Sequence, residues 1–242
     1  MQKLQAIFLD IDDTLYSTTD FTELARQIAI KNMIKAGLKM KPEDAYSELL
    51  EVIAEFSSNF DAHFDKLLSR IPKHTYKDAF PPLLIAAAVA GYHDTKRIML
   101  KPFPDALNFI KTIRDKTNLA LGIITDGLRI KQAEKLWRLD VWKYFNQKAI
   151  FISDDIGISK PNPKLYQKAC QSLGIKPSQA LYVGDNPIND VDPPNKIGMV
   201  TVLLKREGKY KDAKSETEPN YTVFDFSEIL TILKRDFAID GL

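Results

Sequence analysis

Three aspartates within four positions near the start of the chain have the residue types and spacing of a cation or phosphate site. Asp10, Asp12 and Asp13 directly follow the apolar run Ala6–Leu9, which is typical of a buried strand in a parallel sheet. Open α/β sheets bind ligands outside the carboxyl ends of their strands, where these carboxylates would lie. Like charges so close together oppose each other's ionisation unless a cation offsets them. The pattern therefore predicts a metal ion or a protonated partner at Asp10 and Asp12.

Alternation along an extended segment relates the side chains of Asp10 and Asp12. Residues two apart project to the same side, so both carboxylates could face one point while Ile11 packs inward. An ordinary strand-to-loop exit with a helix cap explains the same residues about equally well. The choice between the two interpretations depends on the rest of the chain.

Three further polar clusters follow later apolar runs. Their members are a threonine, a lysine, glycines and further aspartates: Thr125, Asp126 and Gly127, then Lys160 and Pro161, then Gly184, Asp185 and Asp190. A parallel sheet brings the carboxyl ends of all its strands to one edge, so these clusters should converge with Asp10 on one pocket. Each cluster alone is commonly a turn or a helix cap. Four such clusters, each at a predicted strand exit, are poorly explained by chance.

Alternating helices and strands must position these clusters. The pattern predicts strands at 6–9, 119–124, 149–152, 180–183, 199–204 and 221–224, and helices at 105–115, 128–139, 163–173 and 227–234. Strands that alternate with helices indicate an α/β fold with a parallel sheet and right-handed crossovers. Pro187, Pro193 and Pro194 predict that the helical stretch after residue 187 is short or kinked. Residues 205–220 are polar and charged, which predicts an exposed loop.

Residues 16–98 interrupt this alternation with helical periodicity and no convincing strand. Helices are predicted at 21–35, 42–56, 60–70 and 82–92. Gly37 is a plausible stop for the first, and Pro42 is favourable in the first turn of the second. We therefore predict an α-helical bundle domain, residues 16–98, inserted into an α/β core made of residues 1–15 and 99–242. Its hinges are expected at 16–20 and 96–102.

Composition limits the class of protein. Among 242 residues, 45% are hydrophobic and 27% charged, as in ordinary soluble globular proteins. Because 34 basic residues face 32 acidic ones with no dense basic block, we expect no nucleic-acid partner. The longest apolar run, 83–90, is far shorter than the roughly 20 residues of a membrane span. Acids also interrupt the N-terminal apolar run where a signal peptide would continue. We expect a cytoplasmic protein without a membrane partner, and its oligomeric state stays open.

The single cysteine, Cys170, gives a narrower constraint. One cysteine excludes an intramolecular disulfide and a metal site built from several cysteines. It lies within the helix predicted at 163–173. A small residue of the apolar core is therefore the expected role of Cys170, rather than a reactive thiol.

The four clusters resemble the motifs of the haloacid dehalogenase-like (HAD) superfamily of hydrolases. They are Asp10-Ile-Asp12-Asp-Thr14, Thr125-Asp-Gly127, Lys160-Pro161 and Gly184-Asp185-Asn-Pro-Ile-Asn-Asp190, in the order of the family. The resemblance implies a Rossmann-like parallel sheet core with an inserted helical cap of the C1 type. The stretches His63-Phe64-Asp65 and Tyr92-His93-Asp94-Thr95-Lys96 are similar to those of archaeal-type HAD phosphatases, some described as glyceraldehyde 3-phosphate phosphatases.

The resemblance also implies how the carboxylates would act. Asp10 would attack phosphorus as a nucleophile and form an aspartyl-phosphate. Asp12 would protonate the leaving alkoxide and then deprotonate the attacking water. A carboxylate oxygen of Asp10, the backbone carbonyl of Asp12 and a carboxylate of Asp185 would hold Mg²⁺, whose octahedral demand suits few protein ligands plus waters. Asp190 would orient metal-bound water or Lys160 rather than bind the metal.

The remaining motif residues are implied to bind the phosphoryl group. Thr125 and the backbone amides of Asp126 and Gly127 would hold phosphoryl oxygens at a helix N-terminus. Lys160 would offset negative charge on the nucleophile and on the transferred group.

Residues of the inserted helices are candidates for substrate contacts. His63, His93 and Lys96 could reach the substrate, with Phe60 and Phe64 as walls of the pocket. A bundle surface with aromatic residues in its core explains the same side chains more simply.

The carboxyl group at position 12 discriminates between reactions of the family. An alkoxide leaving group needs a proton whereas a halide does not, so the sequence favours phosphate esters. We predict a Mg²⁺-dependent phosphatase of small phosphate monoesters, such as sugar or triose phosphates, acting through an aspartyl-phosphate. A phosphomutase with the same motifs is one alternative. A non-catalytic phospho-ligand binding protein is another, although the Asp10/Asp12 pair argues against it.

Overall fold

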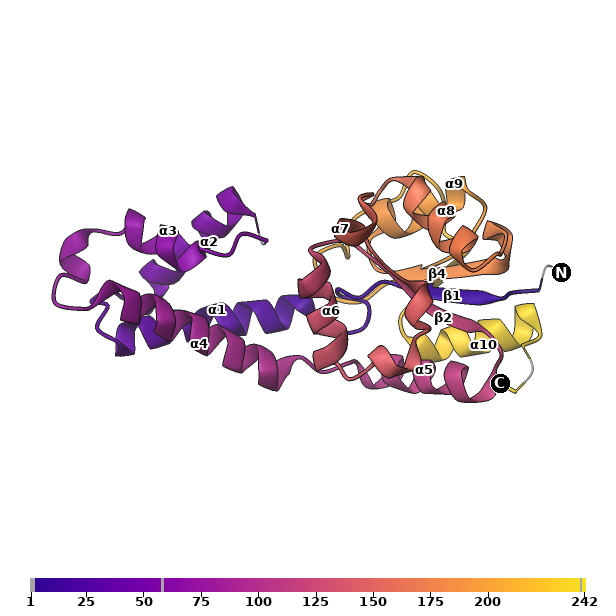
Figure 1. Cartoon of the computed structure of the whole chain (residues 1–242), viewed down its shortest axis with the longest axis horizontal. Helices are drawn as coiled ribbons and strands as arrows, with labels where there is room; N and C mark the ends of the chain where they lie inside the picture. The colour runs from indigo at the N-terminus through magenta and orange to yellow at the C-terminus, as the bar shows by residue number, and fades with distance from the viewer. Residues whose placement is uncertain (1–2, 58, 240) are drawn as a thin grey trace. The chain divides into compact units, whose positions relative to one another are not determined.

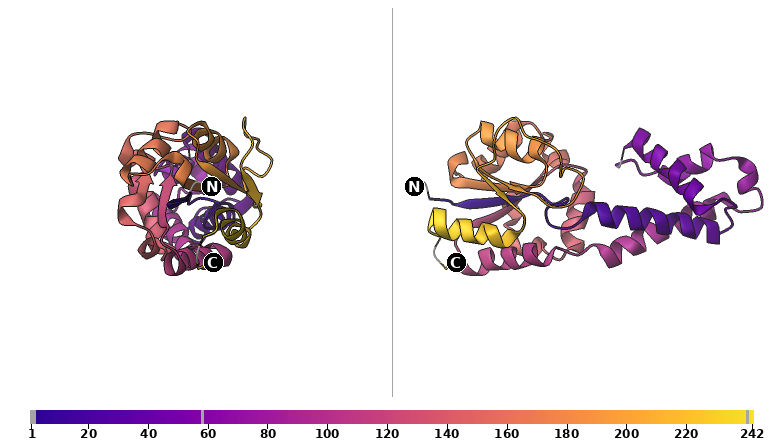
Figure 2. Two further views of the ribbon diagram at one scale, coloured as in Figure 1. Left: turned by 90° about the vertical axis from the view of Figure 1, so that its right-hand side faces the viewer. Right: turned by 180° about the vertical axis from the view of Figure 1, so that it is seen from behind.

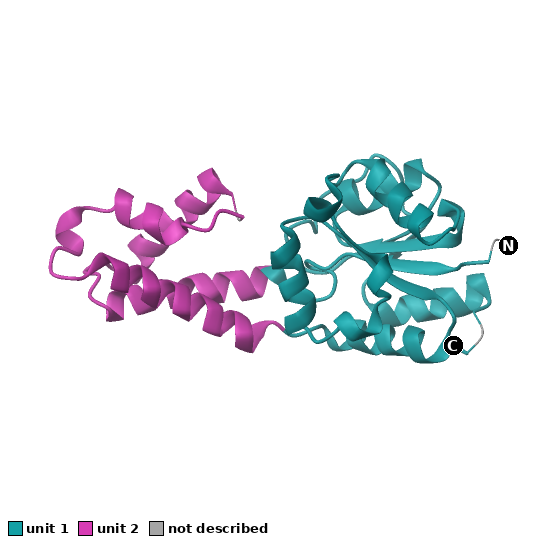
Figure 3. Ribbon diagram, viewed as in Figure 1, with its two compact units in different colours: residues 1–18, 101–242 teal, residues 19–100 magenta. Residues whose placement is uncertain are grey.

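The chain forms two compact units. The computed structural model describes residues 3–57, 59–239 and 241–242. Unit 1 consists of residues 1–18 and 101–242, and unit 2 of residues 19–100 (Figure 3). The sequence predicts 16–98 for the inserted segment, against the 19–100 of the structure. Within unit 1, the Phe103 amide donates to the Leu15 carbonyl at 2.8 Å, close to the points where the chain leaves and re-enters this unit.

Unit 1 is built on a six-stranded sheet in the order β3-β2-β1-β4-β5-β6, with every neighbouring pair parallel. The strands are β1 (Ala6–Leu9), β2 (Ala120–Thr125), β3 (Ile150–Ile152), β4 (Ala180–Gly184), β5 (Val200–Leu204) and β6 (Tyr221–Val223). All four residues of β1 are buried, as expected of a strand covered on both faces. The predicted α/β fold with a parallel sheet is confirmed. Because β1 pairs with both β2 and β4, Asp10 follows a strand flanked on both sides.

Helices cover both faces of this sheet (Figures 1 and 2). They are α5 (Pro104–Lys116), α6 (Arg129–Arg138), α7 (Ser153–Ile156), α8 (Pro163–Ser172), α9 (Asp192–Lys196) and α10 (Phe226–Phe237), with short helical turns at Trp142–Tyr144, Gln147–Ala149 and Pro177–Gln179. In Figure 1, α8 and α9 lie on one face, and α5 and α10 on the other. Cys170 of α8 is buried in a core cluster with Phe8 of β1 and Tyr182 of β4. The prediction that Cys170 is a core residue is confirmed.

The segment after β4 accommodates its prolines. A π-helical turn, Pro187–Val191, leads into the five-residue helix α9, as expected of a short helical stretch. Pro193 and Pro194 lie in the first turn of α9, where the missing N–H groups need no helical partner. The prolines therefore leave Asp190 inside the π-helical turn and fully buried.

Unit 2 is helical and has its own core. Its helices are α1 (Thr18–Lys35, which begins in unit 1), α2 (Pro42–Phe56), α3 (His63–Arg70) and α4 (Pro81–Met99), with a short turn at Lys73–Thr75. Buried residues from all four helices form one cluster, including Met33, Leu49, Leu67 and Leu84. Gly37 follows α1 with a φ of +120°, a conformation open to glycine, which confirms it as the stop. None of the described helices is both long and apolar enough to cross a membrane.

Helix α4 is longer than the sequence pattern suggests. The predicted helix ends at residue 92, whereas α4 continues to Met99. Residues 93–99 contain neither glycine nor proline, so nothing local stops the helix before Pro102. Residues 96–99 of the predicted hinge are therefore helical, and the same is true of residues 18–20, which open α1.

Candidate active site

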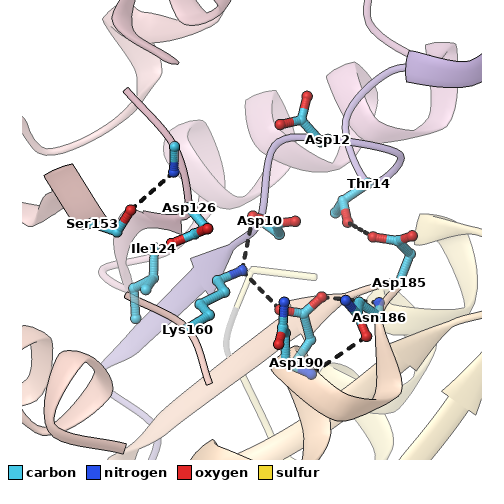
Figure 4. A network of polar contacts seen from close by, with 12 residues as sticks. Asp10, Asp12, Thr14, Ile124, Asp126, Ser153, Lys160, Asp185, Asn186 and Asp190 are labelled. Atoms are coloured by element: carbon cyan, nitrogen blue, oxygen red, sulfur yellow. Dashed lines mark hydrogen bonds and ion pairs between the residues drawn. The ribbon is translucent and has the colours of Figure 1, made fainter. Parts of the chain in front are cut away.

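The predicted motif residues of unit 1 converge at the carboxyl edge of the sheet (Figure 4). Asp10 directly follows β1, Thr125 ends β2 and Asp185 directly follows β4. The segments after β3 and β4 bring Lys160 and Asp190 together, so that Lys160 Nζ lies 2.8 Å from Asp190 Oδ1. Four segments far apart in the chain thus meet beside Asp10, as the parallel topology requires.

Lys160 is the centre of the polar network. Its Nζ lies 2.9 Å from Asp10 Oδ1, 2.8 Å from Asp190 Oδ1 and 2.6 Å from the Tyr182 hydroxyl. Only 2% of the lysine side chain is exposed. Burial alone would lower the pKa of Lys160, but the charges of Asp10 and Asp190 raise it well above its ordinary value. The ammonium group is therefore charged at neutral pH and offsets two buried carboxylates.

Asp190 is held from several sides. Its Oδ2 accepts a hydrogen bond from the Asn186 amide at 3.0 Å, and its Oδ1 lies 3.1 Å from the Tyr182 hydroxyl. A Cβ at position 184 would lie 2.2 Å from Asp190 Oδ2, so the close approach requires Gly184. These contacts fix Asp190 against Lys160, and both of its predicted roles stay predictions.

Three carboxylates form a candidate cation site. Ligand atoms of Asp10, Asp185 and Asp190 all lie within 4.8 Å of one another. Burial raises the pKa of Asp10 to about 7, with Lys160 opposing the shift and Asp190 and Asp12 adding to it. Burial and the neighbouring carboxylates raise the pKa of Asp185 to about 9. A cluster of hard oxygen donors that resist ionisation fits a divalent cation such as Mg²⁺, which would offset their charge.

These pKa shifts predict that the metal-free protein loses stability as the pH rises. Between its ordinary value of 3.8 and about 9, the carboxyl of Asp185 is protonated in the folded chain and ionised in the unfolded one. The folded state then binds more protons, so each pH unit lowers the free energy of unfolding by up to about 1.4 kcal/mol for this one group. The melting temperature in EDTA, followed by tryptophan fluorescence from pH 6 to 8, measures the effect.

An Asp185→Asn variant is the matched control for this measurement. It should show a smaller decline of melting temperature with pH, because one of the two shifted carboxyls is gone. Mg²⁺ should raise the melting temperature of the wild type more at pH 8 than at pH 6, since binding requires ionised ligands. Equal pH dependence in both proteins would show that Asp185 carries no such shift.

Asp12 lies differently from the sequence expectation. Its carboxylate turns away from Asp10 (Figure 4) toward α6, where Lys135 Nζ lies 2.7 Å from Oδ1 and 2.6 Å from Oδ2. The Tyr16 hydroxyl donates to Oδ1 at 2.5 Å. The strand ends at Leu9 and Asp13 has a φ of +52°, so strict alternation no longer governs this segment. The Asp12 carboxylate therefore does not point toward that of Asp10, and its acid-base role stays a prediction.

The surroundings of Asp12 keep it ionised. Burial would raise its pKa, but the charge of Lys135 and hydrogen bonds from Lys135, Tyr16 and Gln132 hold the pKa of Asp12 below its ordinary value. An ionised carboxylate is the form that accepts a proton from water.

The predicted phosphate-binding residues differ in what they offer. Thr125 Oγ1 is buried and has no hydrogen-bond partner among the described residues, so it is a donor in need of an acceptor. The Gly127 amide donates to Ser153 Oγ at 2.9 Å, so this N–H is already used inside the protein. The carbonyl of Asp126 accepts from Gln132 Nε2 at 2.8 Å. Thr125 is therefore the strongest of the three candidates for phosphoryl binding, and that role stays a prediction.

The candidates of the inserted helices all belong to unit 2, and their role in substrate binding stays a prediction. His63 Nε2 lies 2.8 Å from the Ser57 carbonyl and its ring meets that of Phe60 edge-on. His93 is exposed on α4, whereas Lys96 is only 8% exposed. Phe64 packs against the core cluster of unit 2, in line with the simpler interpretation of this aromatic residue.

Tyr182, Gln132 and Lys135 are among the network residues that the sequence patterns did not single out. Tyr182 lies inside β4, where an aromatic residue is typical of the hydrophobic core. Its hydroxyl nevertheless contacts Lys160. Gln132 and Lys135 are three residues apart on α6, so they share a helix face, and both reach Asp12. Their spacing indicates that the two side chains share one face of a helix. It does not indicate which residue that face contacts, because the contact depends on the fold.

Comparison with known proteins adds an independent observation. A family model described as haloacid dehalogenase-like hydrolase matches residues 4–198. The chain belongs to this family. The predicted family and the hydrolase class of the enzyme are thereby confirmed.

Curated relatives of this HAD-family enzyme cover almost its whole length. Glyceraldehyde 3-phosphate phosphatase of Methanopyrus kandleri is 42% identical over 243 residues, which cover 98% of this chain and 100% of the relative. The protein of the same name from Pyrococcus furiosus is 38% identical over 242 residues, covering 99% and 97%. These names agree with the predicted phosphatase class.

Solved structures support the HAD fold. A HAD phosphatase from Thermococcus onnurineus superposes with a TM-score of 0.68 at 22% identity, covering 95% of this chain and 98% of that chain. A 2-haloacid dehalogenase from Pseudomonas syringae pv. Tomato DC3000 gives 0.61 at 21% identity, covering 96% and 99%. At these identities the likeness shows the fold alone.

Proposed function

We propose that this HAD-family enzyme is a Mg²⁺-dependent phosphatase of small phosphorylated metabolites in the cytoplasm, with glyceraldehyde 3-phosphate as the first substrate to test. The observation that carries the proposal is the carboxylate of Asp10 at a strand end, in contact with the buried ammonium group of Lys160. A candidate metal-binding cluster and the unpartnered hydroxyl of Thr125 lie at the same edge. The substrate is suggested by the names of relatives 42% and 38% identical to this chain.

In this proposal, charge is balanced before the reaction begins. Carboxylates of Asp10 and Asp185 and the backbone carbonyl of Asp12 would hold Mg²⁺, which supplies positive charge beside the phosphoryl oxygens. Lys160 favours the ionised form of the nucleophile and orients it through its contact with Asp10 Oδ1. Thr125 donates its free hydroxyl to a phosphoryl oxygen. The site thus concentrates positive charge and donors where the phosphoryl group must lie.

The first step transfers the phosphoryl group to the protein. Since Lys160 contacts Oδ1, the Oδ2 atom of Asp10 attacks phosphorus, the bond from phosphorus to the ester oxygen breaks, and an aspartyl-phosphate forms. The ester oxygen takes a proton from Asp12 as it leaves. A negative phosphate beside Asp12 opposes ionisation of its carboxyl group, so substrate binding favours the protonated form that this step needs.

The second step restores Asp10. Asp12, now ionised, accepts a proton from a water molecule, whose oxygen attacks phosphorus. The bond between phosphorus and Asp10 Oδ2 breaks and inorganic phosphate leaves. The ion pairs and hydrogen bonds that keep Asp12 ionised suit this half of the reaction.

Phosphate release from glyceraldehyde 3-phosphate, with Mg²⁺ and with EDTA, tests the proposal. We expect steady release with Mg²⁺ and background release with EDTA, and a panel of metabolite phosphates then ranks the substrates. A rate that depends on added sugar bisphosphate would instead indicate a mutase. No release from any ester at saturating Mg²⁺ would contradict the phosphatase proposal.

A further inference from the structure

Lys135 reaches Asp12 from the helix that follows β2. Its Nζ contacts both carboxylate oxygens, at 2.7 and 2.6 Å, which makes the contact a two-point ion pair. The lysine side chain is 17% exposed and the aspartate side chain 30% exposed. An exposed ion pair contributes little to the free energy of unfolding. A partly buried pair that uses both carboxylate oxygens fixes the direction of the carboxylate and favours its ionised form.

Gln132, which lies about one helical turn before Lys135 on α6, also contacts the carboxylate of Asp12. Its side chain is 4% exposed, and Nε2 lies 3.2 Å from Asp12 Oδ2 and 2.8 Å from the Asp126 carbonyl. The amide therefore links Asp12 to Asp126, the residue that directly follows Thr125 at the end of β2. Two residues of one helix, α6, thus hold Asp12 relative to the proposed phosphoryl site, together with the Tyr16 and Thr18 hydroxyls, which lie 2.5 and 3.2 Å from Oδ1.

The chemistry explains why Asp12 should stand apart from Asp10. In phosphoryl transfer, the attacking and leaving oxygens lie roughly in line on opposite sides of phosphorus. An acid that protonates the leaving oxygen must therefore lie beyond the phosphoryl group, not against the nucleophile. Figure 4 shows the Asp12 carboxylate turned away from Asp10, and the helix that holds it there is α6.

We propose that Lys135, assisted by Gln132, is a positioning residue that holds Asp12 where it can exchange protons with the leaving group and with water. The inference rests on the proposed phosphatase function and goes beyond it, because neither residue belongs to the motifs of the family. Misplacement of an acid-base group by a small distance slows both proton-transfer steps without removing the nucleophile.

Three variants of the full-length protein separate this role from a structural one. Lys135→Met keeps the length of the side chain and removes its charge. Lys135→Arg keeps a charge that can contact both carboxylate oxygens. Lys168→Met makes the same change as Lys135→Met at an exposed position of α8 and is the matched control.

Stopped-flow measurements with p-nitrophenyl phosphate give the decisive readout. The p-nitrophenolate group leaves without a proton, so aspartyl-phosphate formation does not need Asp12, whereas its hydrolysis does. We expect Lys135→Met to release about one p-nitrophenol per enzyme in a fast burst. A steady state about 10- to 100-fold slower than in the wild type should follow. With an alkyl phosphate such as glyceraldehyde 3-phosphate both steps should slow, and Lys135→Arg should recover most of the rate.

Two results would overturn the role of Lys135. One is a steady-state rate of Lys135→Met equal to that of Lys168→Met. The other is a burst slowed by the same factor as the steady state, which would indicate general damage to the site. Both presuppose an active wild type, so an inactive wild type would count against the proposed function instead.

Discussion

Replacing Asp10 with asparagine is expected to lower kcat for phosphate release by about 10⁴-fold or more, because the amide cannot form the acyl phosphate. The geometry around position 10 should survive, since asparagine has the shape of aspartate and its oxygen can still accept a hydrogen bond from Lys160. Steady-state phosphate release measures the loss. Acid-quenched wild type, incubated with labelled substrate, should carry the label on Asp10, and the variant should carry none.

Asp115→Asn is the matched control for that experiment. Asp115 is exposed near the end of α5 in the same unit, so the same chemical change there should leave the rate unaltered. Both variants should unfold cooperatively. Residual activity of Asp10→Asn within tenfold of the wild type, after deamidation is excluded by mass spectrometry, would assign the nucleophile to another residue.

Replacing Lys160 with methionine should reduce both activity and stability. Lys160 Nζ is the cation between Asp10 and Asp190, whose side chains are 12% and 1% exposed. Removing one member of a buried charged cluster leaves unpaired carboxylates and costs about 3–5 kcal/mol of unfolding free energy. Urea unfolding, followed by tryptophan fluorescence, measures this loss in unit 1, because both tryptophans of the chain, Trp137 and Trp142, lie there.

The double variant Lys160→Met/Asp190→Asn separates the two effects. Neutralising the more deeply buried carboxylate should return a substantial part of the lost stability, because one uncompensated charge disappears. Phosphate release should stay low, since Asp10 still lacks the ammonium group that orients it and offsets its charge. If the double variant were no more stable than Lys160→Met, the contact between Lys160 and Asp190 would not be a stabilising ion pair.

The arrangement of Asp10, Lys160 and Asp185 could be predicted because it depends on topology alone. Asp10 and Asp185 directly follow strands, Lys160 lies on the segment after β3, and parallel strands bring their carboxyl ends together whatever the details of packing. The stop of α1 at Gly37 and the buried position of Cys170 were likewise local properties of the sequence. Such features need only periodicity, turn chemistry and composition.

The direction of Asp12 could not be predicted in the same way. It depends on Lys135 and Tyr16, whose side chains reach the carboxylate only after α6 packs beside the strand exit. The hydrogen bond from the Gly127 amide to Ser153 Oγ could not be predicted either, because the two residues lie on segments that follow different strands. Competition among hydrogen-bond partners is decided by three-dimensional packing, which spacing in the sequence does not record.

The hydrogen bond from Phe103 to Leu15 has a consequence for how such a protein can evolve. It joins the two places where the chain leaves and re-enters unit 1, so residues 19–100 form an inserted segment with a core of its own. An inserted segment whose two ends lie close together can be lengthened, shortened or exchanged without a shift in the register of the sheet. Evolution can therefore preserve the proposed chemistry at Asp10 while the inserted segment diversifies independently.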